Sequence, residues 1–242
     1  MPNLRATTSG RTFLDAHDGA GGKPYVPPEA KPRFRGIMHA WAFVASLPAG
    51  ALLIVAAAGN TAERWVALIY ATSLTGLFGA SAAHHRWTGT PWGRPWLRWL
   101  DHSMIYVLIA GSYTPLCLVA LSQTWRVAVL VAVWSVAVAG VVIKLTRLHR
   151  FRRSAGALYL VMGWAAVIVL PQFARRLPPA SMTLMAVGGL LYTAGAVVLF
   201  RRRPDPLPSV FGYHELWHAL VVGAGACHFA MIFVALHSLP RP

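Results

Sequence analysis

Five residues of this chain have the types and spacing that a metal-dependent active site needs. His214 and His218 are four residues apart, so on a helix both imidazoles would share one face and could bind the same metal ion. Ser81 and His85 have the same spacing. Asp101 is one of only two acids near membrane depth, where an ionisable residue is costly and is a functional candidate.

These residues can be assigned roles in one site. If His85 supplied a third nitrogen beside His214 and His218, a fourth position would be left to water, which is the arrangement of catalytic zinc. Asp101 could hydrogen-bond that water or act as general base, and Ser81 could orient the water or hold an oxyanion. An imidazole-rich site also suits other divalent ions, so the pattern favours Zn²⁺ without proving it.

The composition of the chain shows what kind of scaffold must position these residues. Of its 242 residues, 56% are hydrophobic and only 12% are charged, yet 22 Lys and Arg stand against 7 Asp and Glu. A disordered basic tail would lack this apolar content, and a soluble nucleic-acid-binding domain would not contain uncharged stretches of about 20 residues. We therefore predict an all-α integral membrane protein with no nucleic-acid partner. The two cysteines are no disulfide framework.

Seven segments are long and apolar enough to cross a hydrocarbon core of about 30 Å as helices. We predict a seven-helix transmembrane domain in residues 36–242, preceded by a disordered basic tail over residues 1–35. The fourth segment is short, and Pro171 falls near the end of the fifth. The segments cover residues 36–58, 65–84, 102–121, 127–143, 155–174, 180–200 and 213–239.

Lysine and arginine are divided unevenly between the two sides of this arrangement. The tail and the loops after the second, fourth and sixth segments hold 17 of them, and the opposite side holds five. Because basic loops stay in the cytoplasm, we predict a cytoplasmic N-terminus and an external C-terminus. This orientation brings His85, Asp101 and the His214/His218 pair to the cytoplasmic ends of three helices, at one level of the membrane.

The remaining histidines have simpler explanations. A lone histidine at a helix end is usually an interfacial side chain, which is our interpretation of His39, His84, His102 and His237. His84 is also an alternative metal ligand, although it is offset by about 100° from the face that carries Ser81. His228 would lie about 15 Å deeper than His218 and is more typical of a hydrogen bond between helices.

The string from His214 to His218 also matches H-E-x-x-H, the zinc metalloprotease pattern, in which the glutamate is the general base. Glu215 could serve as that base, or it could pair with a loop arginine such as Arg201. Intramembrane metalloproteases usually carry this motif in an early span, with an Asp-Gly ligand later in the chain. Here the motif is in the last predicted span and Asp101 precedes it, so we rank the protease hypothesis lower.

A longer pattern surrounds these residues. It covers residues 81–85, 100–115 and 212–218 with 226–229, and it includes Ser81, Asp101 and His228. In these stretches, and over about residues 33 to 239, the sequence resembles the hemolysin III family. That family belongs with the progestin and adipoQ receptors, and it is grouped more loosely with the alkaline ceramidases in a superfamily of membrane hydrolases.

The resemblance implies a seven-helix bundle with a cytoplasmic N-terminus and zinc on His85, His214 and His218, with Ser81 and Asp101 beside the metal. One departure is His84, where the family often has tyrosine. We expect a protein of the bacterial plasma membrane that hydrolyses an amide or ester bond of a membrane lipid. The alternatives are a pore-forming or haemolytic protein, as the family name suggests, and a sensor or structural protein with structural zinc. The pattern predicts neither the substrate nor the oligomeric state.

Overall fold

The computed structural model describes residues 32–57, 60–90, 93–145 and 152–238, with the backbone alone described for residues 152–157. In these ranges the chain is helical, as predicted, and seven helical stretches are long and apolar enough to cross a membrane. The fourth stretch is longer than the sequence predicted. The elements are α1 (Ile37–Ala56), α2 (Thr61–Arg86), α3 (Gly93–Ala120), α4 (Gln123–Leu145), α5 (Arg152–Trp164), η2 (Ala165–Val169), α6 (Leu170–Arg176), α7 (Pro179–Arg201) and α8 (Tyr213–His237).

The fifth membrane stretch is interrupted, because α5 gives way to the 3₁₀ turn η2 before α6 begins. Pro171 lies in the first turn of α6, where a proline has no N–H to donate to the preceding turn. The hydroxyl of Tyr113 on α3 donates to the carbonyls of Met162 and Gly163, at 3.0 and 3.2 Å. A neighbouring helix thus satisfies backbone groups just before the break, as membrane helices require.

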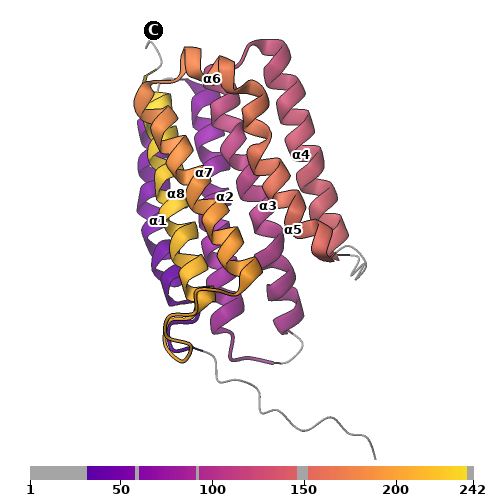
Figure 1. Ribbon diagram of the computed structural model, residues 1–242. Coiled ribbons are helices and arrows are strands. Elements are labelled where there is room, and N and C mark those ends of the chain that lie inside the picture. The colour runs from indigo at the N-terminus through magenta and orange to yellow at the C-terminus, as the bar shows by residue number, and fades with distance from the viewer. Residues whose placement is uncertain (1–31, 58–59, 91–92, 146–151, 239–242) are drawn as a thin grey trace, which may run out of the picture. The chain divides into compact units, whose positions relative to one another are not determined.

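Helix α3 is the centre of the bundle. It packs against α2 and α4 and also contacts α5, α6 and α8, and Figure 1 shows it between α2 and the α4–α5 side. In its most apolar window 67% of the residues are buried, against 17% in α4 and 11% in α7. The outer helices therefore present apolar side chains to the membrane, and α3 carries its polar residues, including Asp101, into the interior.

The first and last helices of the bundle are neighbours. Helix α8 packs along α7 and also contacts α1 and α3, while α1 packs along α2 (Figure 1). Of the predicted tail, residues 1–31 lie outside the described part of the chain, and residues 33–36 form a turn that leads into α1. The N–H groups of Arg33 and Phe34 donate to the carbonyls of Ser209 and Val210, at 3.0 and 3.2 Å. We call residues 33–36 the N-terminal strap.

Candidate metal centre

Three histidines meet where the end of α2 lies beside the start of α8. His85 is in the last turn of α2, and His214 and His218 are in the first two turns of α8. One ring nitrogen from each lies within 4.8 Å of the other two, and the Nε2 atoms of His85 and His214 are 3.3 Å apart. Two nitrogens bound tetrahedrally to one zinc at about 2.0 Å would themselves be about 3.3 Å apart. The structure thus brings the three histidines together, and we call them the histidine cluster.

The burial of His218 supports a metal in the histidine cluster. Its side chain is 0% exposed, and neither ring nitrogen has a hydrogen-bond partner among the described residues. An unsatisfied buried polar group costs about 1–3 kcal/mol, so such groups are rare unless something outside the chain satisfies them. A divalent ion bound by neutral imidazoles would do so, and the donor set therefore fits a metal.

Asp101 and Ser81 lie beside the histidine cluster. Both are buried, at 8% and 3% exposed, and the Ser81 hydroxyl hydrogen-bonds the Asp101 carboxyl group. Asp101 Oδ2 is 3.9 Å from His85 Nε2, too far for a hydrogen bond. Helices α2 and α3 thus place a carboxylate and a hydroxyl next to the nitrogen donors.

A second group of donors shares His85. His84, His85 and Asp101 also have ligand atoms within 4.8 Å of one another, and the rings of His84 and His85 have centroids 4.8 Å apart. The cluster of His84, His85, Asp101, His214 and His218 could therefore hold a metal ion with a donor set of nitrogen and oxygen. This donor group agrees with the alternative, drawn from the sequence, in which His84 is a metal ligand.

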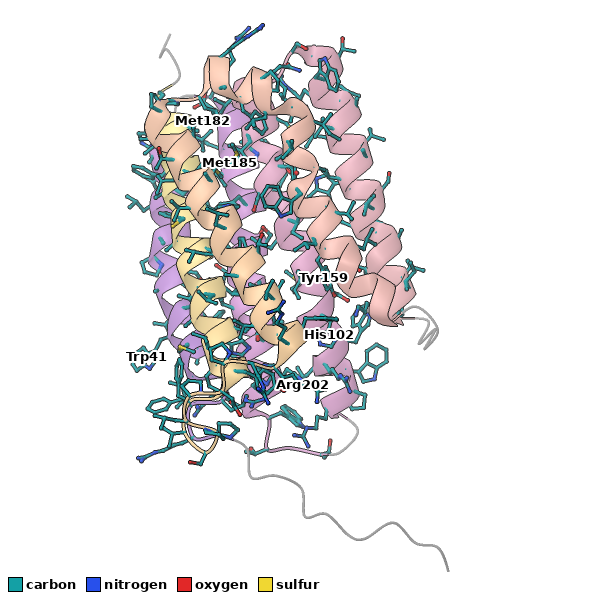
Figure 2. All side chains as sticks on the ribbon, in the orientation of Figure 1. Trp41, His102, Tyr159, Met182, Met185 and Arg202 are labelled. Carbon is teal, nitrogen blue, oxygen red and sulfur yellow. The ribbon has the colours of Figure 1, made fainter. Side chains whose placement is uncertain are left out.

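Four other described histidines lie outside both donor groups: His39, described below, and His102, His228 and His237. His102 is partly exposed on α3, and its carbonyl accepts a hydrogen bond of 3.1 Å from the Tyr159 hydroxyl on α5 (Figure 2). His237 is in the last turn of α8, where its Nδ1 lies 2.7 Å from the Phe233 carbonyl. His228 hydrogen-bonds the backbone of α7, as predicted, and its ring meets Tyr192 edge-on with centroids 5.3 Å apart.

The comparisons with known proteins agree with this architecture. The family model described as haemolysin-III related matches residues 29–229, which include every candidate site residue named above. The chain belongs to the haemolysin-III-related family. It is 33% identical over 207 residues to the "Hemolysin-3 homolog" of Bacillus subtilis (strain 168), covering 84% of this chain and 93% of that protein.

Two further relatives in and near this family cover a similar part of the chain. "Hemolysin-3" of Bacillus cereus is 31% identical over 203 residues, which are 83% of this chain and 90% of that protein. "Monocyte to macrophage differentiation factor" of Homo sapiens is 26% identical over 215 residues, which are 84% and 83% of the two chains. The resemblance seen in the motifs thus extends over most of each chain, and this chain is an integral membrane protein of the family.

His39 is the residue of this site that sequence reasoning missed. We expected an interfacial side chain, but it is 2% exposed and its ring stacks on that of His218, with centroids 3.8 Å apart and an angle of 14° between the planes. The interfacial interpretation is wrong because α1 begins against α8. The buried residues of α1 are His39, Ser46, Gly50 and Leu53. Their spacing places them on one face of the helix. This alignment of His39 with small and apolar residues could have predicted from the sequence that His39 is buried.

Glu215, the glutamate of the H-E-x-x-H string, is occupied by structural contacts. It is 0% exposed, and its Oε2 accepts a hydrogen bond of 3.0 Å from the Gly212 N–H at the start of α8. Its Oε1 forms an ion pair with Arg35 of the N-terminal strap. The partner is therefore Arg35, not the exposed Arg201, and both carboxylate oxygens are engaged in structural contacts. This geometry argues against the metalloprotease hypothesis.

The N-terminal strap passes directly over His85. Gly36 has a φ of 77°, in the left-handed region that favours glycine. A Cβ atom at this position would lie 2.7 Å from the Cβ of His85, closer than any real contact allows. The ion pair of Arg35 and this close approach together fix the strap against the ends of α2 and α8.

Replacing Arg35 with alanine should destabilise the protein by about 3 kcal/mol, because it leaves the fully buried Glu215 carboxylate without its cation. The measurement is the midpoint of thermal unfolding of the purified protein in detergent. Arg33→Ala is the matched control, since Arg33 is exposed and contacts the loop through its backbone, so it should change stability by less than about 0.5 kcal/mol. Equal stability of the two variants would contradict a structural role for the ion pair.

Proposed function

We propose that this protein is a zinc-dependent hydrolase that cleaves an amide or ester bond of a membrane lipid. The observation that carries the proposal is the arrangement of three imidazoles around one point with a carboxylate and a hydroxyl beside them. His85, His214 and His218 would hold the ion and leave a coordination position open, which is typical of catalytic zinc. Imidazole nitrogens suit zinc, although they do not exclude other divalent ions.

The roles of the neighbouring residues follow from their chemistry. Zinc bound there would polarise the scissile carbonyl and lower the pKa of a water molecule toward about 7. Asp101 would take a proton from the attacking water and pass it to the leaving amine or alcohol, so that water is added across the broken bond. Ser81, hydrogen-bonded to Asp101, would orient that carboxylate or stabilise the oxyanion that develops on the carbonyl oxygen.

The position of the site in the bundle suits a lipid substrate. The donors lie at the end of α2, at the start of α8 and near the start of α3. A lipid could place its polar head group there while its hydrocarbon chains stay among the apolar helices. The excess of basic residues on the same side supports a cytoplasmic location. The names of the bacterial relatives refer to haemolysis, which describes an effect on membranes and is compatible with lipid cleavage.

A metal with a purely structural role is the second candidate. The donor group of His84, His85 and Asp101 favours it, because Asp101 or His84 could complete a four-ligand site. In that case the ion would pin α2, α3 and α8 together, and the protein would act as a sensor or a structural membrane protein.

Metal removal and lipid turnover separate these two candidates. The purified protein is incubated with an N-acyl sphingoid lipid and with a glycerol ester lipid, before and after zinc is removed by a chelator. We expect turnover of one class, loss of turnover on chelation and recovery when zinc is added back. A zinc-loaded protein that turns over neither class would contradict the hydrolase and support the structural role.

A further inference from the structure

His39 lies against the histidine cluster and has no role in the chemistry proposed above. It is 2% exposed, and neither of its ring nitrogens makes a hydrogen bond of standard geometry among the described residues; the backbone of His218 offers one of them a weak contact. Leaving such a group unsatisfied costs about 1–3 kcal/mol. Phenylalanine would fill the same space without that cost. Because the His218 backbone can serve only one of the two ring nitrogens, the imidazole indicates that the other nitrogen has a partner outside the chain.

The stacked geometry shows that this partner is not the ion of the histidine cluster. A metal ion lies close to the plane of an imidazole that binds it, about 2.0 Å from the nitrogen. The rings of His39 and His218 are nearly parallel, at 14°, and their centroids are 3.8 Å apart. An ion in the plane of His218 is then about one ring thickness from the plane of His39. Consistently, His39 belongs to neither group of potential metal ligands.

The ring contacts of His39 are with two other aromatic rings, and neither contact satisfies a ring nitrogen. One neighbour is the ring of Phe78 on α2, which meets it edge-on with centroids 5.3 Å apart. The other is His218, which is covered by the stack. We propose that His39 hydrogen-bonds an oxygen atom that belongs to neither the chain nor a metal, either a water molecule or a lipid substrate beside the metal position. The substrate alternative rests on the proposed function, and the water alternative does not.

Two substitutions distinguish the hydrogen bonding of the His39 nitrogens from the stacking of its ring. His39→Phe keeps a ring that can stack but removes the nitrogens, and His39→Gln keeps hydrogen-bonding capacity but removes the stack. Leu53→Ala is the matched control, because Leu53 is 0% exposed on the buried face of the same helix and makes no polar contact with the site. The full-length variants are purified, loaded with zinc or cobalt and compared with the unaltered protein.

The readouts are bound metal, the visible spectrum of the cobalt-loaded protein and lipid turnover. We expect His39→Phe to keep its metal, to shift the cobalt spectrum and to lower turnover by about 10- to 100-fold. His39→Gln should stay closer to the unaltered protein, and Leu53→Ala should lower thermal stability without moving the spectrum. If the cobalt spectrum of His39→Phe differs from that of the unaltered protein already without lipid, the oxygen belongs to water. If the two spectra differ only when lipid is bound, the oxygen belongs to the substrate.

Two outcomes would overturn the assignment of His39. Loss of metal from His39→Phe would make His39 a ligand, and an unchanged cobalt spectrum with and without lipid would make it a packing residue. If the unaltered protein turns over no lipid, the hydrolase proposal fails separately. The cobalt spectrum then still decides whether His39 holds an oxygen.

Discussion

Replacing His218 with alanine is expected to remove the metal from the protein and to abolish lipid turnover. His218 is one of three nitrogen donors, and it is fully buried with no other hydrogen-bond partner among the described residues. Loss of a residue that only supports a metal ligand lowers affinity by about 10- to 100-fold, so loss of a ligand should cost at least about 100-fold. Bound zinc after gel filtration, measured by atomic emission, reports the result.

The control for this variant lies on the same helix. His237→Ala removes an imidazole from the last turn of α8, far from the histidine cluster, where Nδ1 contacts the Phe233 carbonyl. It should keep its zinc and its turnover. If His218→Ala kept zinc at the level of His237→Ala, the ion would be bound elsewhere and the assignment of the cluster would be wrong.

Replacing Asp101 with asparagine is expected to lower turnover by about 100- to 10,000-fold while zinc stays bound. Asparagine has nearly the same shape and can still hydrogen-bond Ser81, but it cannot accept a proton at neutral pH. The size of the effect is that of losing a general acid–base group. The zinc content and the steady-state turnover of whichever lipid class the unaltered protein cleaves are measured on the same preparation.

Glu63→Gln is the control for the loss of a carboxylate, because Glu63 lies in the first turn of α2, at the opposite end of that helix from His85. It should leave turnover unchanged. The Asp101 variant also tests the structural alternative: if asparagine weakens zinc binding along with turnover, Asp101 is a metal ligand and its role as a base is contradicted.

Much of the fold could be predicted from the sequence, because a membrane helix is specified by its own composition. Each of the seven segments was identified from about 20 consecutive apolar residues, without knowledge of its neighbours. The break in the fifth stretch was harder to place, because Pro171 lies in α6 but the 3₁₀ turn η2 precedes it. The orientation of the bundle in the membrane stays a prediction from the basic residues.

The parts of the site that consist of residues four apart on one helix could be predicted from the sequence. The contacts that depend on how separate helices pack could not. The pairs Ser81/His85 and His214/His218 could be found from their spacing. The ion pair of Arg35 with Glu215 joins residues 180 positions apart. No local pattern predicts it, since it exists only because the N-terminal strap folds onto the start of α8. The stack of His39 on His218 likewise requires α1 to lie beside α8.

The central claim is that one metal ion is bound by His85, His214 and His218. It is tested most directly by a crystal structure of the zinc-loaded protein with anomalous diffraction collected on both sides of the zinc absorption edge. We predict an anomalous peak about 2.0–2.1 Å from one ring nitrogen of each of the three histidines. A peak that one of them does not contact, or no peak in zinc-loaded crystals, would contradict the account.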